Sequence, residues 1–285
     1  MEIISDVFDK VGTVILAALF LMFFFAESRS PLRRRVQKRW QRIVINVVMA
    51  IPSFVLLRLL LITTLVWLAI QNQNIRFGIN YLYDAPDWIE GCIAFLILDY
   101  SNYLWHILNH KIPFLWRFHL VHHTDHDLDL STAIRFHFGE MVFSVFFRGL
   151  AVFLTGSSPL TVLVYEIVFE AATQFHHSNL KLPFRFERIL NKLVVTPRMH
   201  GIHHSVIRHE TDSNYSVIFS FWDRLHRSVR LNVPQSDIKI GVLVYPDKKE
   251  LTVWYLLKLP FDKMRVWKDE ARMEEVKGKL DKMRK

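Results

Sequence analysis

Two long apolar segments near the start of this chain limit the folds that it can adopt. Residues 8–26 are apolar apart from Asp9, Lys10 and Thr13, and residues 43–70 form a longer, mostly apolar stretch. Each exceeds the roughly 18–20 apolar residues that a helix needs to cross a membrane. Because a soluble core can also be apolar, the hydrophobic content of 51% does not decide the class by itself. The two segments do, and they predict membrane-spanning helices.

Three further segments are expected to be helical and to enter the membrane. Residues 88–104 form a third candidate span with Asp99 inside it, and residues 141–155 and 159–175 form two shorter ones. The sequence Gly-Ser-Ser-Pro at 156–159 predicts a turn between the last two. We interpret this pair as a hairpin that crosses the membrane or dips into it, with a buried helical pair of a soluble protein as the alternative. The predicted fold is an all-α integral membrane bundle of about four to five membrane helices.

The net charge is +9, and the basic residues are placed unevenly. Those of the loop between the first two spans are Arg29, Arg33, Arg34, Arg35, Lys38, Arg39 and Arg42. Short loops rich in Lys and Arg stay on the cytoplasmic side, whereas the loop at 71–87, with only Arg76, suits the opposite side. The third span then returns the chain to the cytoplasm at His106, and the hairpin keeps His176 and His200 there. We therefore expect a multi-pass protein of the bacterial inner membrane or the endoplasmic reticulum, with its histidine clusters in a cytosolic helical cap.

Several common functional classes find no support in the sequence. Cys92 is the only cysteine, so an intrachain disulfide and a cysteine-based zinc or iron–sulfur site are excluded. The sequence contains no glycine-rich phosphate loop and neither a GxSxG nor an HExxH motif. Two apolar spans flank the basic loop, so we expect no nucleic-acid partner.

Histidines are concentrated in the middle of the chain at helical spacing. The motif HxxxH occurs at 106–110 and HxxHH at 119–123 and 200–204, with His137 and the pair at 176–177 in addition. Residues three and four apart share one face of a helix, so each motif places two or three imidazoles side by side. Neutral imidazole is the commonest side-chain metal ligand near neutral pH. The pattern therefore predicts a metal site built from several helices.

The number of imidazoles favours two metal ions over one. A closed zinc site takes about four ligands, and this chain offers eight or more. Imidazole suits Zn, Cu, Fe and Ni, and all-nitrogen ligation leaves Zn and Fe as the main choices. Zinc alone has no redox chemistry, whereas iron reacts with O2 when coordination positions stay open.

The motifs and the text between them resemble the fatty acid hydroxylase superfamily, the sterol desaturase-like membrane di-iron enzymes. The resemblance covers roughly residues 99–225 and includes both HxxHH motifs. It also includes Pro113 to His119 (PFLWRFH), Ser131 to His137 (STAIRFH), His177 to Leu180 (HSNL), Thr196 to His200 (TPRMH) and Trp222 to Leu225 (WDRL). The chain departs from the family pattern at Ile107, where Arg is frequent, and at 226–228, where Phe-Gly-Thr often follows.

The resemblance implies a membrane bundle under a cytosolic cap that holds two Fe ions, which Zn can replace in preparations. The metal ligands that it implies are His106, His110, His119, His122, His123, His137, His177, His200, His203 and His204. Of these ten residues, His137 matches a histidine of the sterol-type branch only. His176, which precedes the family position, is a second choice outside this set. We expect His126, His209 and His226 to be surface or packing residues.

Carboxylates are expected to hold the ligands in place, because a metal-bound imidazole usually donates its other N–H to a carboxylate or a carbonyl. Asp99 lies seven residues before His106, on about the same helical face, and an ion pair with Arg58 is its alternative role. Asp223 is the second expected residue of this kind. Further candidates are Glu140, Glu166 and Glu170.

The resulting hypothesis is an O2-dependent oxidoreductase that hydroxylates or desaturates a C–H bond of a lipid of sterol or fatty-acyl type. Its electrons are expected from an external electron-transfer protein or reductase, because the sequence carries no flavin or nicotinamide fingerprint. The alternatives are an acyl-chain desaturase of the other tri-histidine membrane family, a non-enzymatic metal-handling membrane protein and an inactive structural member. We expect a transmembrane region at 1–88, the catalytic domain at 89–230, and an interfacial and charged tail at 231–285.

Overall fold

The structure, a computed structural model, describes residues 8–267, and these residues form helices and connecting loops without a named strand. This confirms the predicted all-α class. Residues 1–7 and 268–285, which include most of the expected charged tail, lie outside the described residues. The expected domain boundaries at 88 and 230 stay predictions.

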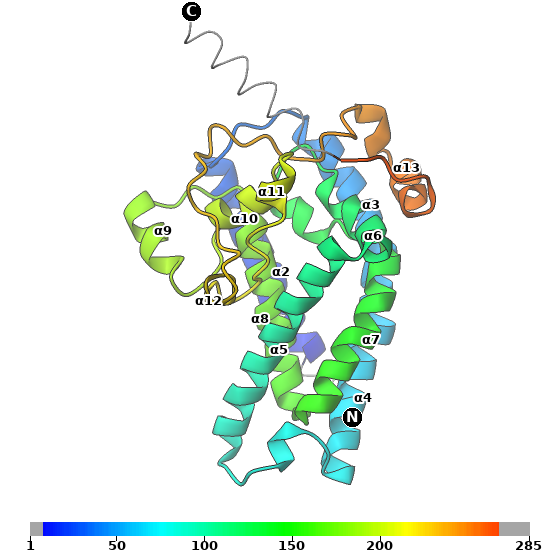
Figure 1. Cartoon of the computed structure of the whole chain (residues 1–285), viewed down its shortest axis with the longest axis vertical. Helices are drawn as coiled ribbons and strands as arrows, with labels where there is room; N and C mark the ends of the chain where they lie inside the picture. The colour runs from blue at the N-terminus through cyan, green and yellow to red at the C-terminus, as the bar shows by residue number, and fades with distance from the viewer. Residues whose placement is uncertain (1–7, 268–285) are drawn as a thin grey trace, which may run out of the picture.

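A bundle of long helices forms the body of the molecule (Figure 1). Its elements are η1 (Phe8–Gly12), α2 (Thr13–Arg29), α3 (Arg39–Leu56), η2 (Leu57–Ile62), α4 (Thr63–Ile75), α5 (Asp87–Lys111), α7 (Phe138–Thr155) and α8 (Pro159–His177). The segments α3, η2 and α4 follow one another without a break, and η2 is a π-helical turn between them. Leu61, Leu65, Leu98, Val152 and Tyr165 are buried together in the core of the bundle.

Shorter helices form a cap over one end of the bundle (Figure 1). They are α6 (Pro113–His123), η4 (Leu130–Ile134), α9 (Phe184–Leu190), α10 (Pro197–His203), α11 (Arg208–Thr211), α12 (Phe221–Leu225), η5 (Lys248–Leu251), α13 (Val253–Lys258) and η6 (Leu259–Phe261). Leu256 and Leu259 are buried against Met49 of α3 and Leu120 of α6. The region at 251–261 is thus packed against α3 and α6, and within it Trp254 is 77% exposed.

Three helical stretches are long and apolar enough to cross a membrane: Lys10–Arg29, Arg39–Tyr81 and Phe138–Thr155. The other two expected spans are helical but fall outside this group. The reason is that α5 buries Asp99, Asn102 and His106, and α8 buries Glu166. Polar groups on the inner faces of α5 and α8 lower the hydropathy of both helices.

The end of the bundle that lies away from the cap is closed by two glycines in left-handed conformations. Gly156 ends α7 with φ 72°, and Gly78, which precedes η3 (Ile79–Tyr81), has φ 119°. A Cβ atom on Gly78 would lie 2.3 Å from the backbone nitrogen of Gly156, so only glycine permits this approach. The contact joins the loop after α4 to the predicted turn at 156–159.

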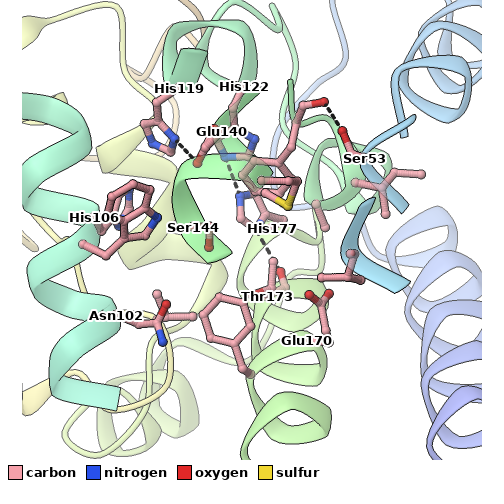
Figure 2. A pocket seen from close by; sticks show the side chains of 18 of the residues that line it. Ser53, Asn102, His106, His119, His122, Glu140, Ser144, Glu170, Thr173 and His177 are labelled. Carbon is pink, nitrogen blue, oxygen red and sulfur yellow. Dashed lines mark hydrogen bonds and ion pairs between the residues drawn. The ribbon is translucent and has the colours of Figure 1, made fainter. Parts of the chain in front are cut away.

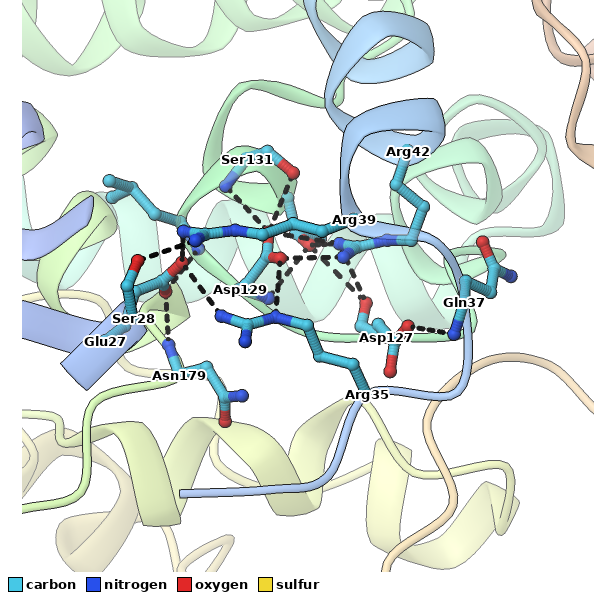
Figure 3. Close-up of polar contacts among 12 residues, drawn as sticks. Glu27, Ser28, Arg35, Gln37, Arg39, Arg42, Asp127, Asp129, Ser131 and Asn179 are labelled. Carbon is cyan, nitrogen blue, oxygen red and sulfur yellow. Dashed lines mark hydrogen bonds and ion pairs between the residues drawn. The ribbon is translucent and has the colours of Figure 1, made fainter. Parts of the chain in front are cut away.

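The basic loop lies at the same end of the molecule as the histidine-bearing cap, and it binds to the cap through buried charges (Figure 3). Arg42 of α3 is 2% exposed, and its guanidinium donates to Asp125 Oδ1 and Asp129 Oδ2, each over 2.7 Å. Burial alone would raise the pKa of Asp125, but the charges of Arg42 and Arg135 outweigh burial and hold that pKa below the usual range. Part of the Arg run therefore fixes the loop that follows α6, and we call the ion pairs of Arg42 with Asp125 and Asp129 the clamp.

The carboxylate of Glu27, at the end of α2, extends this clamp to the segment after α8. It accepts hydrogen bonds from Arg39 Nη2 at 2.8 Å, from the backbone N–H of Leu130 at 3.0 Å and from that of Asn179 at 2.8 Å. Two histidine-bearing segments are thus fastened to the first two bundle helices.

We predict that Arg42→Ala lowers the free energy of unfolding by about 3–5 kcal/mol, because it leaves Asp125 and Asp129 as buried charges without their main partner. Chemical unfolding of the detergent-solubilised protein measures this change. Arg34, which is exposed on the same loop, provides the matched control, and Arg34→Ala should change the free energy by at most about 0.5 kcal/mol. Equal effects of the two substitutions would contradict the assignment of the clamp.

Candidate metal centre

Nine histidines converge in two buried groups where the cap meets the bundle. Eight of them lie in α5, α6, α8 and α10, and the ninth, His204, directly follows α10. The first group contains His106, His110, His119, His123 and His203, and the second contains His122, His177, His200 and His204. Within each group, one ring nitrogen from every residue lies within 4.8 Å of the others. All nine residues are among the ten metal ligands that the family resemblance implies.

Each HxxHH motif contributes to both groups. In α6, His119 and His123 join the first group and His122 joins the second. A helix turns by about 100° per residue, so residues four apart point nearly the same way while the residue between them points to the side. In α10 the assignment is reversed, because His200 and His204 belong to the second group and His203 to the first. The two motifs therefore interlock across both groups.

Backbone carbonyls fix the tautomer of four of these imidazoles. The Nδ1 atoms of His106, His177 and His203 lie 2.7–2.8 Å from the carbonyl oxygens of Tyr215, Thr173 and Ser213, respectively. His122 Nδ1 lies 3.2 Å from the carbonyl oxygen of Arg135. A carbonyl oxygen only accepts, so each Nδ1 must donate, and the lone pair of the neutral ring resides on Nε2. These Nε2 atoms point into the two groups.

The inward-facing lone pairs fit a cation. His122 Nε2 and His177 Nε2 are 3.0 Å apart, and neither can donate a hydrogen bond to the other because both protons are on Nδ1. A proton between them is excluded at neutral pH, since burial lowers the pKa of His177 to about 3. In the first group, His203 Nε2 is buried and has no hydrogen-bond partner, and burial lowers the pKa of His203 to about 3 as well. Buried neutral imidazoles that face one another in this way are suited to bind a transition metal.

Glu140 is the carboxylate that contacts a histidine of the two groups most closely. Its Oε1 lies 2.9 Å from His119 Nδ1 (Figure 2). Asp212, which the sequence analysis did not single out, lies 3.6 Å from His110 Nδ1 and 2.8 Å from Lys111 Nζ. No spacing in the sequence indicated Asp212. It is the neighbour of Ser213, whose carbonyl oxygen accepts a hydrogen bond from His203, and this loop brings it to the site.

The two aspartates predicted to support the site lie one step or more away from the histidines. Asp223 accepts the backbone N–H groups of Tyr215 and Ser216 at 2.9 Å each, and the Tyr215 carbonyl in turn holds His106. Asp99 Oδ2 accepts from Trp222 Nε1 at 2.8 Å and from the backbone N–H of Phe219 at 3.2 Å. The hydrogen bonds of Asp99 thus go to the segment around α12 and not to one of the nine histidines.

The remaining histidines occupy separate positions. His137 lies outside both groups: its Nδ1 caps α7 by accepting from the Gly139 N–H at 3.0 Å, and its Nε2 lies 3.2 Å from the Leu257 carbonyl oxygen. His176 is buried with its ring centre 4.2 Å from that of His200, but it belongs to neither group. His226 is exposed and contacts the Tyr100 hydroxyl, and His126 contacts the Tyr245 carbonyl.

A cavity of about 170 Å³ leads from the histidines into the bundle between α3, α5, α7 and α8 (Figure 2). Histidines from both groups line its upper end, namely His106, His119, His122, His177 and His200. Apolar side chains of the bundle helices, of η4 and of two loops line much of the remainder, namely Ala50, Phe54, Leu57, Trp105, Ile134, Phe136, Met141, Phe169 and Val217. A hydrocarbon chain or ring that enters from the membrane would thus meet the histidines at the end of its path.

Residues 91–228 match the sequence model of the family described as fatty acid hydroxylase, and this range contains all nine histidines. Alkylglycerol monooxygenase of Homo sapiens is 31% identical over 157 residues, which cover 54% of this chain and 33% of that protein. Cholesterol 25-hydroxylase of Homo sapiens is 30% identical over 139 residues, 47% of this chain and 49% of that protein.

The ornithine lipid hydroxylase OlsE of Rhizobium tropici is 31% identical over 161 residues, which cover 55% of this chain and 46% of that protein. The chain thus spans between one third and one half of the length of these curated relatives. No solved structure matches the chain.

We predict that the purified protein binds about two transition-metal ions per chain, because each histidine group supplies at least the roughly four ligands of one ion. His203→Ala should lower the content to about one ion by disrupting the first group, and His204→Ala should do the same through the second. Metal analysis by mass spectrometry on matched preparations measures the content.

Two variants serve as controls for this prediction. His226→Ala and His137→Ala should keep both ions, since neither residue lies in a group. A wild-type content of one ion that is unchanged in the His203 variant would sink the dinuclear site.

Proposed function

We propose that this chain, whose residues 91–228 belong to the fatty acid hydroxylase family, is a membrane-bound oxidoreductase that uses two iron ions and O2 to hydroxylate or desaturate a C–H bond of a lipid. The observation that carries the proposal is the junction between the two histidine groups and the apolar cavity. A lipid segment in this cavity would present its C–H bonds to both groups at once.

The residues of the two groups would hold one iron ion each. Bound iron would supply the O2 chemistry that an unactivated C–H bond requires, which no amino-acid side chain supplies. The protein contributes the placement of the ligands. The carbonyls of Tyr215, Thr173 and Ser213 orient three imidazoles, and the carboxylate of Glu140 orients His119.

The cavity contributes orientation and the exclusion of water. Its apolar lining favours the hydrocarbon part of a lipid and disfavours water, so that the reacting C–H bond is held in a dry environment. The relatives are named for alkylglycerol, cholesterol and ornithine lipid, which share a hydrocarbon part but differ in their polar groups. We therefore propose a lipid of sterol or fatty-acyl type as the substrate class.

The proposal includes an external electron-transfer protein or reductase as the electron donor. The position of the histidines argues against an ion-conducting role, because such a role would need histidines along a path through the membrane. In the described residues, the two groups lie at the junction with the cap, beyond the middle of the long helices.

We predict that His177→Gln abolishes lipid oxidation, because amide oxygen is a poor substitute for imidazole at iron. The loss should exceed the roughly 10- to 100-fold effect typical of changes to residues that only support a ligand. Expression and membrane insertion should stay near wild type, since no spanning segment is altered. Product formation, measured by mass spectrometry under O2 with a supplied reductant, reports the effect.

His226→Gln is the control for that assay, and it should keep most of the activity because His226 is exposed and outside both groups. Full activity of the His177 variant would remove this residue from the site. If His203→Ala were fully active too, the proposed di-iron chemistry would be wrong.

We further propose that the histidine-bearing end faces the cytoplasm, because the basic loop between α2 and α3 lies at this end. Single cysteines at Ser236 in the cap and at Asp84 in the opposite loop, both exposed, test this orientation in a chain with Cys92→Ser. A membrane-impermeant thiol reagent should label Ser236→Cys only from the cytoplasmic side and Asp84→Cys only from the other. Labelling of both positions from one side would refute the topology.

A further inference from the structure

The lower end of the cavity carries charged side chains that the proposed chemistry does not use. Arg148 of α7 and Glu170 of α8 line this part of the cavity. Arg148 is buried, its Nη2 donates a hydrogen bond to Glu166 Oε1, and its guanidinium carbon lies 4.7 Å from the centre of the Phe169 ring. A charged subsite thus lies in the cavity, where the uncharged polar residues Asn102, Ser144 and Thr173 also belong to the lining.

Helix geometry gives the distance between this subsite and the histidines. Glu170, Thr173 and His177 share one face of α8, and Thr173 lies between the other two in Figure 2. A rise of 1.5 Å per residue places Glu170 about 10 Å from His177 along the axis. On α7, which runs in the opposite direction, the same rise places Arg148 about 12 Å from Glu140. Both helices therefore put the charged subsite roughly 10 Å below the proposed site of oxidation.

The subsite holds two carboxyl groups, those of Glu166 and Glu170, and one guanidinium group. Arg148 supplies one guanidinium, and its hydrogen bond goes to Glu166. Among the described residues, no N–H or O–H group donates a hydrogen bond to the carboxylate of Glu170. A carboxyl group in an apolar environment is costly unless a donor satisfies it. Since Glu170 lines the cavity, a donor on a bound lipid can reach it.

We infer that Glu170 is a specificity-determining residue that accepts a hydrogen bond from a hydroxyl group of the lipid, about 10 Å from the C–H bond that is oxidised. This inference rests on the proposed function for the identity of the reacting end. The hydroxyl group can belong to a sterol ring or to a linear chain, because both present the same O–H donor. Glu170 would fix how deep the lipid enters, and thereby which carbon reaches the histidines.

Equilibrium binding of matched lipid pairs tests this inference on the detergent-solubilised full chain. One pair is a radiolabelled long-chain primary alcohol and its methyl ether, and the other is a sterol and its 3-O-methyl ether. In each pair only the O–H donor differs, so the ratio of the two dissociation constants isolates the hydrogen bond. Binding is measured without reductant, and no turnover is needed.

The wild-type protein should bind the alcohol of at least one pair about tenfold or more tightly than its ether, because only the alcohol can donate a hydrogen bond to the Glu170 carboxyl group. Glu170→Met should remove this preference and leave the affinity for the ether within about twofold, since Met fills a similar volume without an acceptor. Glu170→Gln should keep part of the preference through its amide oxygen. Glu90→Met, in which the same residue type is replaced near the start of α5, should keep all of it.

Two results would overturn the inference: no discrimination by the wild-type protein in either pair, or unchanged discrimination by Glu170→Met. The pair that discriminates also identifies the hydroxyl as that of a ring or of a chain. Because this assay measures binding alone, its failure is separable from a failure of the proposed oxidation, which the His177 variant tests through product formation.

Discussion

The structure depends on how a set of uncharged imidazoles is made to point its lone pairs inward. Carbonyl oxygens of Thr173 and Arg135 accept hydrogen bonds from the Nδ1–H groups of His177 and His122. The two Nε2 atoms then face each other at a distance of 3.0 Å. Such an arrangement is unfavourable for isolated neutral rings, and a bound cation relieves it. Protonation does not, because burial keeps the pKa of His177 near 3. The Thr173 carbonyl belongs to α8, whereas the carbonyls of Arg135, Ser213 and Tyr215 lie in loops of the cap, so these loops must be held at fixed positions.

Holding those loops requires more than apolar packing. Arg42 and Asn46 of α3 bind the segment after α6 through Asp125 and Ser131, and Arg135 donates from there to the Val121 carbonyl. The arginine run, on which the proposed orientation in the membrane rests, thus also fastens the cap to the bundle. If that orientation holds, one stretch of sequence serves both topology and site geometry.

The position of the cavity explains why a membrane protein suits the proposed chemistry. Its walls come largely from the long helices, while its upper end carries histidines of α5, α6, α8 and α10, the helices that supply the two groups. In the proposed function, a lipid segment in this cavity would reach the histidines along a largely apolar lining. The polar residues that this design requires on α5 and α8 are the reason that neither helix has the hydropathy of a typical span.

The sequence by itself determined the helical class, the apolar spans, the turn at 156–159 and the nine histidines, because apolar length and helical spacing are local properties. Which histidines of each HxxHH motif share a group was decided only by the tertiary structure, which brings residues of α5, α6, α8 and α10 together. The same holds for the carboxylate at His119: Asp99 shares a helix with His106 but bonds Trp222, whereas Glu140 reaches His119 from α7. Asp212 and Glu170 likewise gained their positions from tertiary contacts. Local periodicity specifies the face on which a side chain lies, but its partner depends on how segments distant in sequence come together.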